Sequence, residues 1–299
     1  MGGSPRRVGE GSPDGRALGT PIRRCCFTKL ATFDSGKSLT MASLESRGVT
    51  KVFRSLGREI QALRSVNFVT ADDEFLCVVG PSGSGKTTLL KILSGILEPT
   101  AGRVVIHSPN GREPRNALVF QEHGLFPWMT VRENVAFGLE MQGVGRRERT
   151  EAAHDFIRRV GLERYDGCYP CELSVGMRQR VALARAFVAR AQILFLDEPF
   201  GALDAQTRFL LQQELLALWA GERKLVIFVT HDIDEAVLLG DRILVLSGAP
   251  GTVRQEISVD LPRPRDPTGA HWARAAELKR GIWAMLEEEV RKGLYEGNP

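Results

Sequence analysis

One stretch of the sequence has the residue types and spacing of a loop that binds a polyphosphate. Residues 80–88 contain the pattern G-x-x-x-x-G-K-[ST], between an apolar run and a stretch that favours a helix. Glycines let the backbone wrap closely around phosphate groups, and the N-terminus of the following helix adds a partial positive charge. The nucleotide-binding residues predicted here are Gly80, Pro81, Ser82, Gly83, Ser84, Gly85, Lys86, Thr87 and Thr88. The alternative, a glycine-rich turn without a ligand, is less consistent with a strand before the loop and a helix after it.

Two side chains of this loop are expected to act on the phosphates directly. Lys86 should reach the β- and γ-phosphates, and the Thr87 hydroxyl should bind Mg²⁺. The remaining ligands of the Mg²⁺ ion would be phosphate oxygens, water and a carboxylate from a distant part of the chain. The sequence must therefore supply that carboxylate elsewhere.

The pair Asp197 and Glu198 follows an apolar run, Ile193 to Leu196, at the point where ligands collect in open parallel sheets. Asp197 is the predicted Mg²⁺ ligand. Glu198 can polarise the attacking water, which requires a carboxylate in a partly desolvated site. Taken alone, two acidic residues after a strand are ordinary; together with the phosphate loop they predict a P-loop NTPase.

The elements that hold these residues indicate an α/β fold with a mainly parallel core sheet. The runs Phe75–Val79, Ile193–Leu196 and Leu225–Val229 are continuously apolar, as expected for central parallel strands covered by helices on both faces. Short β-prone runs from Leu44 to Phe68, matched by Arg103–Ile106, predict an N-terminal antiparallel sheet.

A helical subdomain is predicted within the α/β domain, at about residues 130–175. Thr130 and Glu133 have the spacing of a capping box at a helix start. An apolar stripe at helical spacing follows, formed by Ala152, Ala153, Phe156, Ile157 and Val160. Beyond a proline-rich segment, the run around Ala273 to Val290 favours a further helix.

The chain divides into an N-terminal extension, residues 1–40, an ATPase domain, residues 41–270, and a C-terminal helical tail, residues 271–299. The extension is rich in Gly, Ser, Pro and Arg and is expected to be disordered or not translated, with Met41 as the alternative start. It also carries the whole net charge of +4, with seven basic and three acidic side chains. The balanced remainder has no basic face of the kind that binds nucleic acid.

Composition and cysteine usage exclude several other classes. Hydrophobic residues make up 43% of the chain, but no run reaches the roughly 20 residues of a membrane-spanning helix, and the N-terminus lacks a signal-peptide core. The chain is therefore expected to stay in the cytoplasm. Five cysteines, with Cys77 inside an apolar run, argue against a disulfide framework. Cys168 and Cys171 form a C-x-x-C, but no second pair or histidine cluster completes a zinc site.

Residues 173–180 read L-S-V-G-M-R-Q-R, which resembles the L-S-G-G-Q signature of ABC ATPases. The resemblance extends over about residues 44–265 and keeps the family's order of motifs. These are the phosphate loop, Gln121, the signature, Asp197 with Glu198, the segment Ala202-Leu203-Asp204, and His231. The resemblance implies the ABC ATPase fold, with ATP as nucleotide.

The resemblance also assigns roles that spacing alone does not. It implies that Gln121 contacts Mg²⁺ and senses the nucleotide, and that His231 contacts the γ-phosphate, both acting beside Glu198 and Lys86 in catalysis. Phe53 would stack on adenine, although an aromatic residue of the first sheet can equally belong to the core.

Two copies of such a chain face each other head to tail in the family. Ser174 and Gly176 of one copy would then close on ATP bound at Lys86 of the other, so the resemblance predicts a homodimer. A serine at this place can also cap the helix that follows, and the two roles are compatible.

Two departures from the signature qualify the resemblance. Val175 replaces a glycine, and a β-branched residue is costly if that position needs a positive φ, with slower hydrolysis or weaker dimer closure as the expected effect. Met177 in place of glutamine is similar to the variant found in nitrate, sulfonate and taurine importers. Segments 120–122, 125–131 and 260–265 resemble the same branch.

The function predicted from the sequence is that of the ATP-hydrolysing subunit of an ABC importer. It would energise uptake of a small anionic solute through a separate permease at the cytoplasmic face of the membrane, with a periplasmic or lipid-anchored solute-binding protein as an indirect partner. The run Leu125 to Trp128 is either the groove for a permease helix or part of the subdomain core. The alternative function is a soluble or regulatory ABC ATPase that is not coupled to transport.

Overall fold

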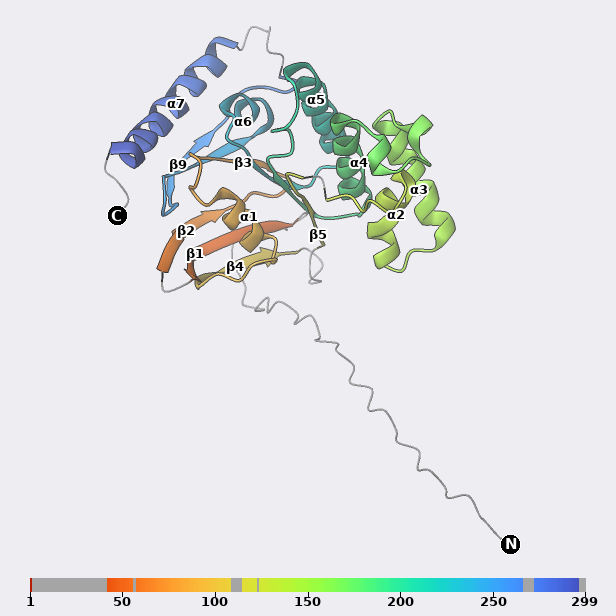
Figure 1. Cartoon of the computed structure of the whole chain (residues 1–299). Helices are drawn as coiled ribbons and strands as arrows, with labels where there is room; N and C mark the ends of the chain where they lie inside the picture. Colours follow the sequence, from red (N-terminus) through yellow and green to blue (C-terminus); the bar gives the residue numbers. More distant parts are fainter. Residues whose placement is uncertain (2–41, 56–57, 109–114, 123, 266–271, 296–299) are drawn as a thin grey trace.

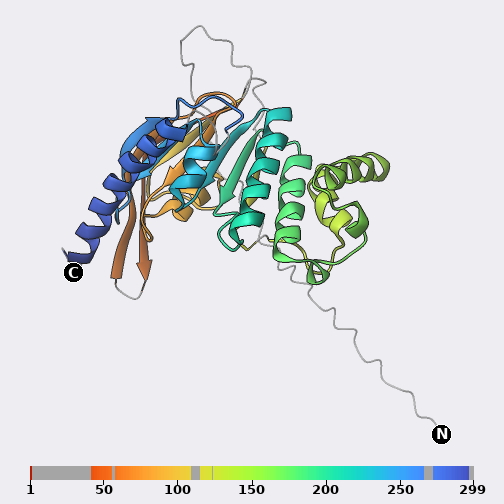
Figure 2. The same ribbon diagram turned by 90° about the horizontal axis from the view of Figure 1, so that it is seen from above.

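The computed structural model describes residue 1 and residues 42–55, 58–108, 115–122, 124–265 and 272–295. Apart from its first residue, the predicted N-terminal extension, residues 1–40, lies outside the described residues. The described chain contains two β-sheets flanked by helices, with α7 and the helical subdomain at opposite ends of the molecule (Figures 1 and 2).

The smaller sheet is the predicted antiparallel one. Its strands are β1 (Ser43–Ser55), β2 (Arg58–Val69) and β4 (Ala101–His107), in the order β2-β1-β4. Both neighbours of β1 pair with it in the antiparallel sense. The apolar residues that β1 and β2 turn inward, including Leu44, Leu63 and Val66, are fully buried, which explains the alternating pattern of the sequence.

The larger sheet holds the strands that position the candidate site. Its order is β5-β6-β7-β3-β8-β9, and only β9 runs antiparallel to its neighbour. The strands are β3 (Phe75–Val79), β5 (Asn116–Val119), β6 (Ile193–Asp197), β7 (Leu225–Val229), β8 (Arg242–Leu246) and β9 (Val253–Ser258). All residues of β3, β6 and β7 are buried, as predicted from their continuous apolar runs.

The helices divide between the two faces of the sheet, the helical subdomain and the C-terminus. They are α1 (Lys86–Leu93), α2 (Val131–Met141), α3 (Arg146–Arg159), α4 (Val175–Val188), α5 (Ala205–Gly221), α6 (Ile233–Leu239) and α7 (Trp272–Tyr295), with short 3₁₀ turns at Glu163–Tyr165 and Pro170–Glu172. The predicted capping box at Thr130 is present, because its hydroxyl accepts from the Glu133 N–H and the Glu133 carboxylate accepts from the Thr130 N–H. Helices α2 and α3 pack on each other and on α4, and they form the inserted helical subdomain of the predicted fold.

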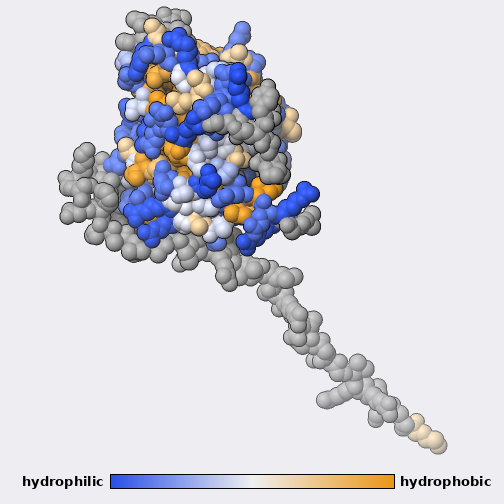
Figure 3. Space-filling view, turned by 90° about the vertical axis from the view of Figure 1, so that its left-hand side faces the viewer, coloured by the Kyte–Doolittle hydropathy of each residue, from blue (hydrophilic) through white to orange (hydrophobic). Residues whose placement is uncertain are grey.

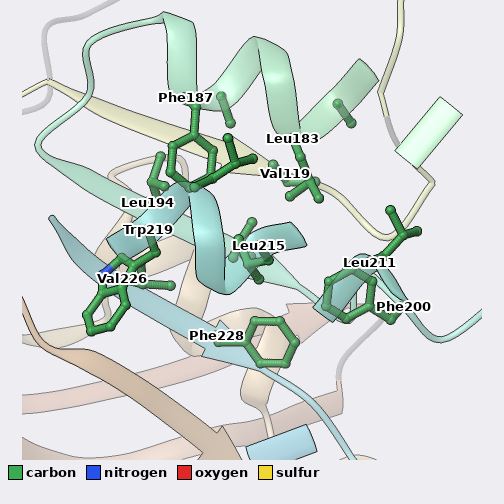
Figure 4. Close-up of a cluster of buried hydrophobic side chains, with 14 of the residues drawn as sticks. Val119, Leu183, Phe187, Leu194, Phe200, Leu211, Leu215, Trp219, Val226 and Phe228 are labelled. Carbon is green, nitrogen blue, oxygen red and sulfur yellow. The ribbon is translucent and has the colours of Figure 1, made fainter. Parts of the chain in front are cut away.

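Two apolar clusters occupy the two faces of the central sheet. Successive side chains of β3 point to opposite faces of the sheet. Phe75 and Cys77 pack with α4, α5 and α6, whereas Leu76 and Val78 pack with α1 and the antiparallel sheet. In the first cluster, the ring of Phe75 meets Trp219 edge to face at 5.5 Å between centroids. Figure 4 shows this cluster, in which Trp219 of α5 lies over the strands.

The proline-rich segment after β9 ties α6 to the sheet. Arg263 forms an ion pair with Asp241 at 2.8 Å, and Arg265 donates to the carbonyl oxygens of Val237 and Gly240 at the end of α6. These carbonyls have no partner inside a helix, so a buried guanidinium satisfies them. Burial of Arg265 lowers its pKa to about 10.

None of the described helices is long and apolar enough to cross a membrane.

Candidate nucleotide-binding site

The predicted site residues converge at the carboxyl ends of three adjacent strands. Strands β6, β7 and β3 are consecutive in the sheet and parallel, so the residues after them meet at one edge. The phosphate loop follows β3, Asp197 ends β6 with Glu198 next, and His231 lies two residues after β7. The three separate sequence segments therefore form one site.

The phosphate loop has a backbone that requires glycine at two places. Gly83 and Gly85 have φ of 80° and 85°, and a Cβ on Gly85 would lie 2.8 Å from the carbonyl oxygen of Ala62. Gly85 also caps α1, whose first N–H groups have no partner within the helix. The hydroxyl of Ser84 is fully buried and lacks a hydrogen-bond partner among the described residues. Such a loop has donors for a polyphosphate, which is the ligand its sequence predicts.

Lys86 is held inside the loop. Its Nζ donates to the carbonyl oxygens of Gly80 at 2.9 Å and Pro81 at 3.0 Å, and the residue is 7% exposed. Burial lowers the pKa of Lys86, while the carboxylates of Glu198 and Asp197 oppose this shift. An anionic phosphate in the loop would favour the charged ammonium further.

Thr87 and Asp197 meet as the predicted Mg²⁺ ligands require. The Thr87 hydroxyl donates to Oδ1 of Asp197 at 3.0 Å, although the two residues belong to α1 and β6. Asp197 is buried, and burial raises the pKa of its carboxyl, with the Thr87 hydrogen bond acting in the opposite direction. A hydroxyl and a carboxylate oxygen side by side are the ligand types that Mg²⁺ prefers.

Glu198 is paired with His231 across the sheet edge. Nδ1 of His231 lies 3.0 Å from Oε2 of Glu198. The backbone of Glu198 has a φ of 43°, uncommon for a residue with a side chain, and its N–H donates to the carbonyl of Val229 at 2.9 Å. Strained conformations of this kind cluster at functional sites, where surrounding contacts hold them. Glu198 combines this backbone conformation with the contact of its carboxylate to His231.

A buried polar network lies directly behind His231, and sequence reasoning missed it. The hydroxyl of Thr230 donates to Glu235 at 2.6 Å, and the amide of Gln212 donates to the same carboxylate at 3.1 Å. Arg208 of α5 pairs with Asp232 at 3.2 Å. Burial raises the pKa of Glu235. The network fixes the turn that carries His231, and its only sequence signal is Asp232, which caps α6.

Gln121 and Phe53 lie further from these contacts. Gln121 is exposed two residues after β5, which is the parallel neighbour of β6, so it emerges at the same sheet edge as Asp197. No hydrogen bond links its side chain to the site within the described part of the chain. Phe53 is 40% exposed on β1, with Nζ of Lys51 5.3 Å from its ring centroid. The alternative of Phe53 as a core residue is therefore wrong.

The signature forms the start of α4. Ser174 is its N-cap, with Oγ accepting from the N–H of Met177 at 3.3 Å, which confirms the capping role. Val175 is the first helical residue and is not among the described residues with positive φ. The expected backbone cost of a β-branched residue at this position is therefore absent. Ser174 and Gly176 lie at the start of α4, and no hydrogen bond joins either of them to Lys86 within the described residues.

Gly176 packs tightly against α5, which makes a substitution there informative. A Cβ on Gly176 would lie 2.9 Å from the Cγ2 methyl of Thr207, so either this β-branched side chain or the helix backbone would have to move. We expect Gly176→Ala to lower the free energy of unfolding by about 1 kcal/mol, despite the better helix propensity of alanine. Urea denaturation measures this change.

Thr207→Ser is the matched background for this test because it removes only the methyl group that the new Cβ would meet. In that background Gly176→Ala should no longer destabilise the protein. An equal loss in both backgrounds would show that contact with Thr207 is not the reason for glycine here.

Among the described residues, no group of three or more His, Cys, Asp or Glu side chains could hold a metal ion. Cys168 is partly buried, Cys171 is exposed, and both are free thiols, as is Cys77. The Thr87 and Asp197 pair is a different kind of metal site, since phosphate oxygens and water would complete its ligands.

Comparison with known proteins decides the family. Residues 63–201 match the family model described as ABC transporter. Over 84% of its length the chain is 46% identical to an uncharacterized ABC transporter ATP-binding protein of Methanocaldococcus jannaschii, covering 94% of that protein. The chain belongs to the ABC transporter ATP-binding family.

Other members are similar over most of their length. The nitrate import ATP-binding protein NrtD of a Synechocystis strain is 42% identical, with 73% of this chain and 83% of that protein covered. The aliphatic sulfonates import ATP-binding protein SsuB of Bacillus licheniformis is 45% identical, with 76% and 88% covered. The predicted resemblance to this importer branch is confirmed.

A solved structure also matches. It is the dimeric structure of a post-hydrolysis state of an ATP-binding cassette bound to ADP and Pi, with a TM-score of 0.65 and 33% identity, covering 73% of this chain and 100% of that one. The predicted ABC ATPase fold is confirmed. As ABC cassettes hydrolyse ATP to power transport, the prediction of an ATP hydrolase coupled to transport is confirmed as well.

Proposed function

We propose that this ABC ATPase drives import of a small anionic solute, of the nitrate, sulfonate or taurine type, through a separate permease at the cytoplasmic face of the membrane. A solute-binding protein outside the membrane would deliver the solute to the permease. The similarity to relatives named for nitrate and sulfonate import supports the class of solute. The exposed Trp128, in the loop before α2, carries the proposal of a permease contact.

The chemistry proposed for the site follows from the contacts described above. Lys86 and the loop N–H groups bind the phosphates of ATP, and Asp197 with Thr87 would hold Mg²⁺, with Gln121 as a further ligand from the resemblance. A bound Mg²⁺ ion would neutralise charge on the phosphates. Glu198 accepts a proton from the attacking water, and His231 orients that carboxylate.

A second copy would complete each ATP site. We propose that Ser174 and Gly176 at the N-terminus of α4 contact ATP held at Lys86 of the partner copy. The backbone N–H groups at this helix start are suited to phosphate oxygens. The dimeric state of the similar cassette supports this arrangement. ATP binding would then favour the closed dimer, and hydrolysis would release it.

The proposed permease contact centres on an aromatic group at the start of α2. The ring of Phe126 packs on Phe137 at 4.6 Å between centroids, and the guanidinium of Arg185 lies 5.7 Å from it. Trp128, whose ring is 5.6 Å from Phe126, is 69% exposed. Phe126 thus belongs to the subdomain packing, whereas Trp128 is the apolar residue left for a partner helix.

Trp128→Ala tests coupling to a permease. In membranes that contain the co-expressed permease, we expect at least about a tenfold loss of affinity for the permease and a similar loss of ATP-driven solute uptake, because buried tryptophans dominate interface energies. ATP hydrolysis by the isolated chain should stay within about twofold of the parent, since Trp128 touches none of the site residues.

Met141→Ala is the control, because Met141 is 64% exposed at the C-terminal end of α2, whereas Trp128 lies just before the start of that helix. It should leave uptake unchanged. A parent chain that hydrolyses ATP but neither binds the permease nor supports uptake would favour the alternative, a soluble or regulatory ABC ATPase. Uptake assays with nitrate, an alkanesulfonate and taurine in parallel distinguish the three solutes.

A further inference from the structure

The C-terminal helix α7 is fixed to the ATPase domain along one face. Ile282, at its middle, is fully buried. Lys279 pairs with Asp234 in the first turn of α6 at 2.6 Å, and Glu289 accepts from the N–H of Gly248 at 2.9 Å. The contacts at both ends fix the orientation of α7, so its remaining faces have a defined position.

A second stripe of α7 is mostly exposed, with only Ala276 partly buried. Its members follow the spacing of four and three residues that places side chains on one helix face, and they are Ala276, Arg280, Trp283, Glu287 and Val290. Trp283 is 65% exposed and Val290 is 44% exposed. Figure 3, which views the side of the molecule that bears α7, shows a mostly hydrophilic surface with separate hydrophobic patches.

The stripe is complementary to its own reversed copy. Trp283 lies at the midpoint of Trp272–Tyr295, so an antiparallel pair of α7 helices related by a two-fold axis would place the two indoles together. Ala276 of one helix would then face Val290 of the other. Arg280 would face Glu287, and within the described residues Arg280 has no ion pair. A mixed stripe of this kind fits a second copy better than a membrane surface, which would favour basic residues alone.

The stripe is also continuous with the site that the two copies are expected to share. A hollow of about 490 Å³ separates α7 from the turn after β7. Its walls are formed by His231, Asp232, Ile233, Asp234, Lys279, Arg280 and Trp283. Trp283 and His231 thus border one hollow, so a partner copy that approaches His231 comes close to α7 as well.

We propose that α7 forms a second contact between the two copies, as an antiparallel pair about Trp283. This contact lies outside residues 63–201, the part that matches the family model. It would hold the copies near each other and so raise the effective concentration of one ATP site for the other. The inference rests on the proposed dimer but adds a surface that the dimer alone does not require.

Charge exchange in the full chain tests the contact. In the Glu198→Gln background with Mg-ATP, sedimentation equilibrium measures the dimer dissociation constant. Arg280→Glu and Glu287→Arg should each weaken the dimer about tenfold or more, because each places like charges together twice across the two-fold axis. The double variant restores opposite charges and should return to within about threefold of the parent.

Glu277→Arg is the matched control. Glu277 is exposed on α7 outside the stripe, and its loss breaks one pair with Arg274, just as Glu287→Arg breaks one pair with Arg291. It should leave dimerisation unchanged.

Cross-linking is a second measurement of the same contact. The new thiol of Trp283→Cys should be joined to the same thiol of the other copy by a short bifunctional reagent, and peptide mapping identifies the cross-linked residues.

Single charge reversals that leave the dimer intact, or losses that the double variant does not restore, would overturn the α7 contact while leaving the ATP-dependent dimer in place. A parent that stays monomeric with Mg-ATP would overturn the proposed dimer and the α7 contact together. The two failures are therefore distinguishable.

Discussion

Replacing Glu198 with glutamine is expected to lower kcat for ATP hydrolysis by about 10²- to 10⁴-fold, the range for loss of a positioned general base. Glutamine keeps the shape of the side chain and can still bond to His231, which now lies 3.0 Å from Oε2. It cannot accept a proton from water. ATP binding should stay within about threefold of the parent, because Lys86 and the loop are unchanged. Steady-state hydrolysis and ATP titration measure the two quantities.

Glu98→Gln is the control for this result, since Glu98 is an exposed carboxylate after α1 and is not one of the residues assigned to the site. Its kcat should stay near the parental value. If Glu198→Gln keeps more than about a tenth of the parental kcat, another group activates the water and the role proposed for Glu198 is wrong. If it loses ATP binding, the substitution has disturbed the loop instead.

The part of the site that could be predicted from sequence is the part fixed by local pattern and strand order. The glycine spacing of the phosphate loop dictates a backbone that few other residues allow, as the φ of Gly83 and Gly85 shows. The apolar runs of β3 and β6 identify buried parallel strands, whose ends must share an edge. The loop and the strand order together are enough to predict that Thr87 and Asp197 lie close to each other.

The remainder depends on contacts between residues whose spacing carries no signal. The positive φ of Glu198 is set by surrounding structure, including the bond from its N–H to Val229. The Glu235 network joins α5, the turn after β7 and α6, and neither Gln212 nor Glu235 differs in the sequence from an ordinary polar helix residue. At Val175 the sequence suggested a constraint that the structure lacks. The family has a glycine there, which raised the expectation of a positive φ, but Val175 is the first residue of helix α4.

The position of α7 was also beyond sequence reasoning. Its apolar periodicity predicts a helix near Ala273–Val290, and α7 spans Trp272–Tyr295. Periodicity does not say which surface a helix covers. The ion pair of Lys279 with Asp234 and the bond of Glu289 to Gly248 decide that, and they place Trp283 beside the hollow that contains His231.

Lys86→Met should abolish measurable ATP binding, with the dissociation constant for ATP raised about 100-fold or more. Methionine has a similar length and is well tolerated in a buried site, so the change removes mainly the charge and three N–H donors. The carbonyl oxygens of Gly80 and Pro81 already hold the Lys86 ammonium in the folded loop, although burial lowers its pKa. It is therefore preorganised for a phosphate.

This prediction separates loss of binding from loss of fold. Without ATP, the thermal midpoint of Lys86→Met should stay close to that of the parent, because removal of a buried charge offsets the lost bonds to the two carbonyls. With saturating ATP the parent should gain stability and the variant should not. Lys91→Met, five residues further along α1, should respond to ATP as the parent does. An ATP-dependent rise in the midpoint of Lys86→Met equal to that of the parent would show that the backbone N–H groups of the loop, rather than the lysine, supply most of the phosphate affinity.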